Sequence, residues 1–269
     1  MNELLERLEA RVSSYGSTAV LVALSGGVDS AVVTAVSARA RGHANVTAVT
    51  AVSPSYPAGE LETARSLAAE IGVTHRVIET HEVEREAYAR NDELRCFHCK
   101  TELYATLGRL AATAGHGVAV LAGANADDLA DVRPGLRAAT QHGVRNPLLE
   151  ERVGKSEIRA IARELGLSVA DKPALACLSS RVAFGIRITP SLLSRVDRAE
   201  QAVRRLGFDA VRVRHRGPAA TIEVPVGDLA RLREHTALEQ LLAELRSLGW
   251  DDVSVDPAGY RQGSLNPTR

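Results

Sequence analysis

The residues with the clearest chemical potential form a short loop, SGGVDS, at 25–30. The loop follows an apolar run at 18–24, which predicts a buried strand, and precedes a helix expected over 31–40. Its two glycines allow close backbone approach, and the N-terminus of a helix favours an anion. Its serines add hydroxyl donors, and Asp29 is a suitable ligand for Mg²⁺. The loop predicts a phosphate or pyrophosphate site; the alternative is a tight turn with a serine N-cap.

A second polar run, GANADD at 123–128, follows another apolar stretch at 118–122. Gly123 would pass close to a nucleotide, and Asp128 is the carboxylate we favour as a further Mg²⁺ ligand. The alternative is an Asn/Asp-rich turn that caps a helix. Because ligands of parallel sheets bind at the carboxyl ends of strands, the segments 25–30, 53–56 and 123–128 should converge on one site.

The chain has three cysteines, Cys96, Cys99 and Cys177. The spacing C-x-x-C with a distant third thiol indicates a metal site, an iron–sulfur cluster or a redox pair. Tetrahedral zinc would need a fourth protein ligand, and His98 between the first two thiols is poorly placed to supply it. Three buried thiols without a chemical role are the alternative.

Cys177 lies in the stretch ALACLSSR at 174–181. Lys172 precedes it, and Ser180 and Arg181 follow it. Nearby cations lower the pKa of a thiol, and the thiolate is the form that attacks an acyl adenylate. The apolar residues around Cys177 are also typical of a buried structural thiol, so these residues alone leave both interpretations open.

The hydrophobic pattern predicts an α/β fold for the first part of the chain. Four apolar segments predict strands, and the segments between and after them predict helices, so a mostly parallel sheet with right-handed crossovers is expected. The strands are expected at 18–24, 45–52, 74–79 and 118–122, and the helices at 31–40, 59–71, 102–114 and 155–165.

The pattern changes near residue 188 and predicts a second, α+β domain. The expected division is 1–188 and 189–269. In the second part we expect a helix over 189–206, a hairpin, a helix over 226–248 and a strand at 253–255, with hairpin strands at 211–215 and 220–224.

Composition limits the classes of function. The formal net charge of the 269 residues is zero, which argues against a large nucleic-acid-binding surface. No apolar run reaches the roughly 20 residues that a membrane-spanning helix needs, and the N-terminus does not resemble a signal peptide. A cytoplasmic protein without membrane or nucleic-acid partners is therefore expected. Lysine is rare, at positions 100, 155 and 172 only.

The loop at 25–30 resembles the SGGxDS loop of the PP-loop ATP pyrophosphatase superfamily, whose members cleave ATP to AMP and pyrophosphate; it departs from the Walker pattern. Nearly the whole chain resembles the LarE family of that superfamily. The segments that carry this resemblance are RCFHCK at 95–100, GANADDLADVRPG at 123–135, NPLLE at 146–150, GKSEIR at 154–159, DKPALACLSSR at 171–181 and GYRQGSLN at 259–266.

LarE proteins are ATP-dependent sulfur transferases in the synthesis of the nickel-pincer nucleotide cofactor. The resemblance implies a PP-loop (adenine nucleotide alpha hydrolase-like) sheet with helices on both faces, and use of ATP and Mg²⁺ to adenylate a carboxylate of pyridinium-3,5-biscarboxylic acid mononucleotide. In single-cysteine members the cysteine gives up its own sulfur. Three-cysteine members hold a [4Fe–4S] cluster and donate a cluster-bound sulfide. This chain resembles the three-cysteine members, and both sulfur sources stay open.

The resemblance also implies roles for individual residues and an oligomer. The family assembles through its C-terminal domain as trimers paired into hexamers. Arg212 and Arg214 would face the same side of a strand and bind the substrate phosphate; a solvated polar face is the alternative. Further candidates are Cys177, Arg181 and Lys172 for catalysis, Ser25, Gly26, Gly27, Asp29, Ser30 and Gly123 for the nucleotide, Asp29 and Asp128 for Mg²⁺, Cys96, Cys99 and Cys177 for a cluster, and, more weakly, Ser180, Glu200 and Glu223.

Three other functions fit parts of the pattern. A tRNA thiolase of the same superfamily would also use three cysteines, but it needs a basic RNA surface. An amide-forming ligase related to NAD or GMP synthetase would give the three cysteines no chemical role. A non-enzymatic AMP sensor would bind the nucleotide without cleaving ATP.

Overall fold

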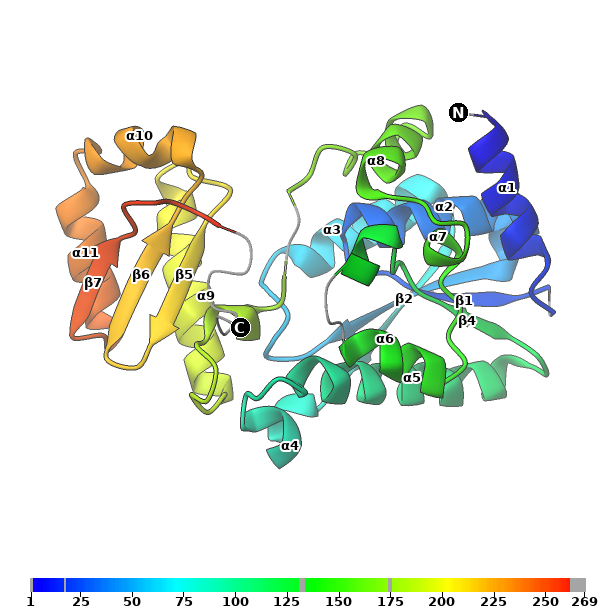
Figure 1. Ribbon diagram of the computed structural model, residues 1–269, viewed down its shortest axis with the longest axis horizontal. Helices are drawn as coiled ribbons and strands as arrows, with labels where there is room; N and C mark the ends of the chain where they lie inside the picture. The colour runs from blue at the N-terminus through cyan, green and yellow to red at the C-terminus, as the bar shows by residue number, and fades with distance from the viewer. Residues whose placement is uncertain (1, 17, 131–133, 174–175, 262–269) are drawn as a thin grey trace. The chain divides into compact units, whose positions relative to one another are not determined.

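The computed structural model describes residues 2–16, 18–130, 134–173 and 176–261, and its chain forms two compact units (Figure 1). The first unit comprises Met1–Ser53, Ala58–Glu82 and Leu94–Leu175. The second comprises Pro54–Pro57, Val83–Glu93 and Ala176–Arg269. No helix in the described part of the chain combines the length and the apolar character that crossing a membrane requires.

The first unit contains a four-stranded sheet in which all neighbouring strands are parallel, as predicted. Its strand order is β3-β2-β1-β4, with β1 Val20–Ala23, β2 Val46–Val52, β3 Thr74–Glu79 and β4 Ala119–Leu121. Because β1 and β4 are neighbours, the loops that follow them lie at the same edge of the sheet.

Helices cover both faces of this sheet (Figure 1). Alternate residues of β1 enter different cores: Val20 and Val22 pack into one core with α1, α2, α3 and α8, whereas Leu21 packs into the other with α5 and α6. The helices of the unit are α1 Asn2–Ser13, α2 Val28–Arg41, α3 Glu60–Ile71, α5 Arg95–Ala114, α6 Pro134–Gln141, α7 Pro147–Glu150 and α8 Lys155–Glu164.

Two helices of the first unit begin earlier than the sequence predicts. α2 begins at Val28, so Asp29 and Ser30 belong to its first turn. α5 begins at Arg95 and not at residue 102, which places the C-x-x-C motif in a helix. The apolar stripe explains the extension, because Phe97 packs against the same core as Leu107 and Ala111.

The second unit has α+β architecture, as predicted. Thr189 caps α9 (Pro190–Arg205) and accepts a hydrogen bond from the Leu192 N–H at 3.2 Å. A mixed sheet of order β5-β6-β7 packs beside it. β5 (Arg212–Arg216) and β6 (Ala219–Glu223) form the antiparallel hairpin, and β7 (Asp252–Val255) runs parallel to β6.

The single helix predicted over 226–248 is wrong. A short 3₁₀ turn leads into α10 (Leu229–Arg233), and α11 (Leu238–Ser247) follows after a break. His235 stabilises the break, because its Nδ1 accepts a hydrogen bond from the Ala237 N–H at 3.1 Å. This side-chain-to-backbone bond competes with helix continuation.

The compact units do not follow the expected division at 188/189, because residues 176–188 group with the second unit. Val182 forms a parallel bridge with His215 of β5, and the Ala183 N–H donates to the His215 carbonyl at 3.0 Å. Ser179 shares a buried 2.6 Å hydrogen bond with the hydroxyl of Tyr88, which belongs to α4 (Glu86–Ala89). Cys177 therefore belongs to the second unit.

Candidate functional site

The SGGVDS loop is folded by its own serines. The Ser25 N–H donates to Ser30 Oγ at 3.1 Å, and Ser30 Oγ donates to the Gly27 carbonyl at 2.9 Å. Ser30 is buried, whereas Ser25 is exposed. Gly27 is the N-cap of α2 and offers no side chain to the N–H groups of the first turn. These N–H groups and the helix dipole suit a phosphate, with Ser25 as an additional donor.

Gly123 brings the end of β4 against the first turn of α2. A Cβ atom at Gly123 would lie 2.9 Å from Ser30 N and 3.0 Å from the carbonyl carbon of Asp29. Any side chain at this position would push the two segments apart. Close packing against Asp29 and Ser30 therefore explains why position 123 is a glycine. A contact between Gly123 and a nucleotide remains a prediction.

Asp29 joins two of the three segments that the sequence predicts to converge, 25–30 and 123–128; the third, 53–56, lies mostly in the second unit. Its Oδ2 lies 2.5 Å from Lys155 Nζ, and its Oδ1 accepts a 3.4 Å hydrogen bond from Asn125 Nδ2. Asn125 belongs to the run at 123–128, in which Asp128 Oδ2 accepts a bond from the Asn125 N–H at 3.1 Å. The carboxyl ends of β1 and β4 therefore meet at Asp29.

Two of the three lysines contact this loop region. Lys155 begins α8 and pairs with Asp29, and Lys172 Nζ lies 3.2 Å from the Gly26 carbonyl and 2.8 Å from Glu60 Oε2. We did not select Lys155 from the sequence, although the rarity of lysine marked it. Lys172 was expected to act on the Cys177 thiol, but the structure gives its ammonium group these other partners.

The donors at this edge match the needs of a magnesium triphosphate. Mg²⁺ takes one or two carboxylates together with substrate phosphate oxygens, and Asp29 supplies a half-exposed carboxylate. Lys155 supplies a compact positive charge beside it, of the kind that binds phosphate. The residues present therefore fit ATP and Mg²⁺.

Cys96 and Cys99 lie in the first two turns of α5, one exposed and the other half-buried. Cys177 lies in the other unit. Within the described ranges, no group of three or more His, Cys, Asp or Glu side chains is arranged to hold a metal ion. Cys96 and Cys99 thus offer two thiolate ligands within one unit.

Arg181 organises the backbone around Cys177. Its guanidinium donates to the carbonyls of Ala176 at 2.6 Å and Cys177 at 3.0 Å. Ser180 Oγ donates to the same Cys177 carbonyl at 2.8 Å. The Cys177 thiol is half-buried, whereas Arg181 is fully buried. Arg181 contacts main-chain atoms of Cys177, and this fixes the turn that carries the thiol.

A buried ionic network surrounds this turn. Arg181 pairs with Glu200 at 2.7 Å, and Arg214 pairs with Glu223 at 2.8 Å. Burial opposes ionisation of Glu200, but the charge and hydrogen bonds of Arg181 outweigh it and hold the pKa of Glu200 below its ordinary value. Glu200 is therefore an anion that neutralises Arg181.

Arg212 and Arg214 are buried, with 6% and 5% of their surfaces exposed, so the alternative of a solvated polar face is wrong. Burial and then the nearby Arg181 lower the pKa of Arg212. Among the described residues of the second unit, three buried guanidinium groups accompany two buried carboxylates, those of Arg181, Arg212, Arg214, Glu200 and Glu223. These side chains form a buried, charged cluster next to the turn that carries Cys177.

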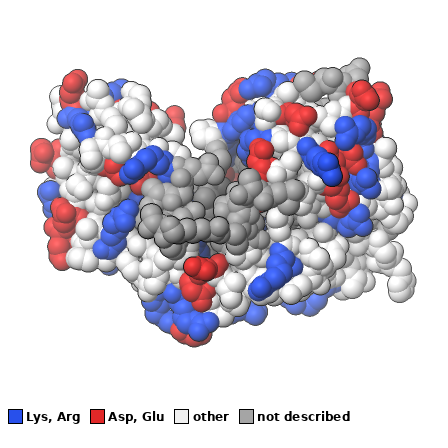
Figure 2. All heavy atoms as spheres, viewed as in Figure 1, with Lys and Arg blue, Asp and Glu red and all other residues white. Residues whose placement is uncertain are grey.

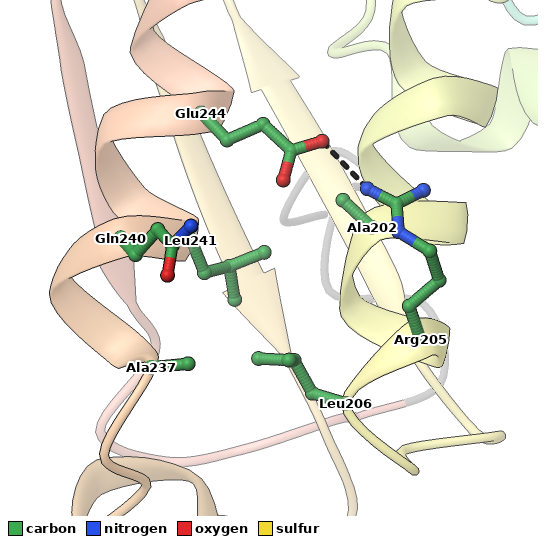
Figure 3. A pocket seen from close by; sticks show the side chains of 7 residues that line it. All are labelled: Ala202, Arg205, Leu206, Ala237, Gln240, Leu241 and Glu244. Atoms are coloured by element: carbon green, nitrogen blue, oxygen red, sulfur yellow. Dashed lines mark hydrogen bonds and ion pairs between the residues drawn. The ribbon is translucent and has the colours of Figure 1, made fainter.

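A pocket of about 200 Å³ lies elsewhere in the second unit, between α9 and α11 (Figure 3). Its lining is mixed, and the ion pair of Arg205 and Glu244 is part of it; the other lining residues are Ala202, Leu206, Ala237, Gln240 and Leu241. None of the predicted site residues lines it. On the face of the molecule in Figure 2, basic and acidic side chains are interspersed.

Comparison with known proteins gives three relatives and one family. The NAD synthase family model matches residues 1–102. A pyridinium-3,5-bisthiocarboxylic acid mononucleotide synthase of Lactiplantibacillus plantarum is 35% identical over 93% of this chain and 89% of its own length. An uncharacterized protein of Synechocystis is 44% identical over 91% of both chains. An uncharacterized protein of Methanocaldococcus jannaschii is 29% identical over 64% of this chain and 66% of its own.

Proposed function

Because the chain belongs to the LarE family of the PP-loop ATP pyrophosphatase superfamily, we propose that it is an ATP-dependent sulfur transferase. Its substrate in this proposal is pyridinium-3,5-biscarboxylic acid mononucleotide, and its product is the corresponding thiocarboxylate of the nickel-pincer cofactor pathway. The observation that supports the ATP-dependent step of this reaction is the ion pair of Asp29 and Lys155 beside the N-terminus of α2. This pair supports the proposal because a carboxylate is a suitable Mg²⁺ ligand and an ammonium group suits a phosphate.

The first step is adenylation. A carboxylate oxygen of the substrate attacks the α-phosphorus of ATP, the bond to the bridging oxygen breaks, and pyrophosphate leaves. Asp29 and Asp128 would hold Mg²⁺, which neutralises the phosphates, and Lys155 would move from Asp29 to a phosphate oxygen. Nucleotide contacts come from the loop and from the end of β4, at Ser25, Gly26, Gly27, Ser30 and Gly123.

The second step uses the thiolate of Cys177. Its sulfur bonds to the carbonyl carbon of the adenylate, the carbon–oxygen bond to AMP breaks, and AMP leaves as a phosphate anion. Arg181 and Ser180 support this step by fixing the Cys177 carbonyl and thus the turn that presents the thiol. The guanidinium groups of Arg212 and Arg214, which lie two residues apart on β5, would bind the substrate phosphate, because a guanidinium group suits a phosphate; Glu223 would hold Arg214 in place and Glu200 would hold Arg181.

Adenylation is compatible with two sulfur sources, and the attack by the Cys177 thiolate applies to the first of them. If Cys177 is the source, a base removes its Cα proton and the Cβ–S bond breaks, which leaves dehydroalanine and a substrate thiocarboxylate. A [4Fe–4S] cluster would supply instead a sulfide bound to an iron that lacks a protein ligand, with Cys96, Cys99 and Cys177 as the thiolates. An assembly of trimers or hexamers through the second unit also belongs to this proposal.

The substitution Cys177→Ala separates the two steps. The variant should still release pyrophosphate and form the acyl adenylate, because adenylation precedes thiolate attack, and it should form no thiocarboxylate. Without the thiolate, AMP is released only as water hydrolyses the adenylate. Pyrophosphate release and mass spectrometry of the product measure the two outcomes. Thiocarboxylate formed by the variant would contradict the role of Cys177. In the wild type, loss of H₂S from Cys177 after turnover identifies the cysteine as the source, and an intact Cys177 in an iron-containing protein identifies the cluster.

The match of residues 1–102 to the NAD synthase family favours an amide-forming ligase as the second candidate. That match ends just after the C-x-x-C motif and does not include Cys177. Incubation with ATP, a carboxylate substrate and ammonia would yield an amide if this candidate were correct.

A further inference from the structure

The Lys172 side chain makes two polar contacts, one with the SGGVDS loop and one with Glu60 at the start of α3. Its Nζ donates to the Gly26 carbonyl at 3.2 Å and to Glu60 Oε2 at 2.8 Å. The side chains of Lys172 and Glu60 are 20% and 14% exposed, so the ion pair is largely shielded from water. Arg159 holds the main chain at this point by donating to the Lys172 carbonyl at 2.8 Å.

The Gly26 carbonyl belongs to the peptide bond that joins the two glycines of the loop. In a trans peptide, the C=O and N–H groups point to opposite sides of the plane. An ammonium group that holds the Gly26 oxygen therefore directs the Gly27 N–H away from Lys172. Gly26 has φ of +80°, a conformation that glycine adopts readily, so this peptide plane needs an external contact to keep one orientation.

Glu60 also packs against Gly26 and pairs with Lys172. Its Oε2 would lie 3.1 Å and its carbonyl oxygen 3.3 Å from a Cβ atom at Gly26. Glu60 also begins α3 and balances the charge of Lys172.

We propose that Lys172 and Glu60 form a clamp on the Gly26–Gly27 peptide, which aims the Gly27 N–H at the triphosphate. Lys172 is then a positioning residue of adenylation, acting through the loop, and has no part in the sulfur step. This inference rests on the proposed binding of ATP at the loop.

The test compares Lys172→Met with Arg163→Met, which breaks an exposed ion pair in the same part of the chain. Loss of a charge-assisted hydrogen bond should raise the Kd for MgATP, measured by calorimetry, about tenfold or more in Lys172→Met and leave it unchanged in Arg163→Met. Thiocarboxylate formed per AMP should stay at the wild-type ratio. Glu60→Gln keeps an acceptor for Lys172 and should have a smaller effect on Kd.

A double-mutant cycle with Gly26→Ala separates the clamp from general stabilisation. Since the alanine already disturbs the peptide, Lys172→Met should add little to the Kd in that background. Additive effects of the two substitutions on Kd would contradict the clamp. A wild-type Kd for MgATP in Lys172→Met, together with less thiocarboxylate per AMP, would also contradict it and would assign Lys172 to the sulfur step. If Lys172→Met does not fold, Glu60→Gln and Lys172→Arg carry the same comparison. Failure of the wild type to bind ATP would reject the proposed function itself, and the clamp with it.

Discussion

At the scale of single residues, Asp29 connects several parts of the candidate nucleotide site. It contacts Lys155 and Asn125, which come from different segments, and it is the carboxylate closest to the helix N-terminus. An acidic group at a phosphate site would repel the ligand unless a cation lies between them. Lys155 balances Asp29 in the structure described, and Mg²⁺ is the cation expected there when ATP is bound.

The substitution Asp29→Asn should reduce pyrophosphate formation by about a hundredfold or more, because the amide binds Mg²⁺ poorly. Pyrophosphate release at increasing Mg²⁺ concentrations measures this, and a partial recovery at high Mg²⁺ is expected. Asp171→Asn is the control, since its carboxylate is 76% exposed and pairs with Arg163 at the surface. Wild-type rates in Asp29→Asn would remove Asp29 from the magnesium site.

The sequence could predict the loop and Asp29, because the SGGVDS motif is local and its glycines and carboxylate are adjacent. It could not predict that Lys155 reaches Asp29 from 126 residues away. It also suggested a thiol-activating role for Lys172 from proximity in sequence, whereas the side chain contacts the Gly26 carbonyl. Distant side chains meet only once the sheet is assembled, and only the rarity of lysine pointed to these two.

At the scale of elements, the turn at Leu178–Arg181 depends on α9 and β5. Glu200 of α9 lies between Arg181 and the Val213 N–H, to which its Oε1 is 3.2 Å distant. A buried pair of this kind adds little net stability, but removal of one partner leaves an uncompensated charge.

Glu200→Gln should lower the free energy of unfolding at pH 7 by about 3–5 kcal/mol, because Arg181 stays buried and charged. The pKa of Glu200 is lower in the folded protein than in the unfolded chain, where it is about 4.3, so the ionised carboxylate stabilises the fold. This contribution to the free energy of unfolding is fully present above about pH 4.3 and is lost as the pH falls through the folded pKa. Urea unfolding should therefore show a gap between variant and wild type that narrows below about pH 4. Glu244→Gln, which breaks an exposed pair, should differ little at any pH. A gap that does not change with pH would contradict this assignment.

Periodicity predicted both ends of every strand in the first unit's sheet to within two residues, because buried parallel strands are continuous apolar runs. It failed for the helix over 226–248, where the apolar pattern continues across the break. The signal for that break is a single His235 hydrogen bond, which periodicity does not contain.

At the scale of the whole molecule, the two units are interleaved along the chain. Pro54–Pro57 and Val83–Glu93 belong to the second unit although they lie within the sequence of the first. The sequence suggested one boundary at 188/189 because periodicity reports where the pattern of elements changes. It does not report which distant loops complete a core, and Tyr88 and Asn91 complete the second one.

Asn91 offers the sharpest test of this interleaving. It is fully buried, its φ is +56°, and its Nδ2 donates to the carbonyls of Ala183 at 2.8 Å and Ile186 at 3.0 Å. Asn91→Ala removes the donor to both carbonyls, of which the Ala183 carbonyl still accepts from the Ile186 N–H at 3.2 Å. It also places a Cβ-bearing residue without a polar side chain at positive φ, so it should cost about 2–5 kcal/mol. Asn91→Gly removes the same hydrogen bonds without the backbone strain and should cost less.

Hydrogen exchange locates the effect of Asn91→Ala. Protection should fall at 176–188 and in β5 and β6, while β1, β2 and the Kd for MgATP stay at wild-type values, because the loop at 83–93 supports the second unit only. A matching loss of protection in β1 and β2 would show that the units unfold together and would contradict the division. The expected pattern would mean that a loop inserted in the ATP-binding unit stabilises the turn that carries Cys177.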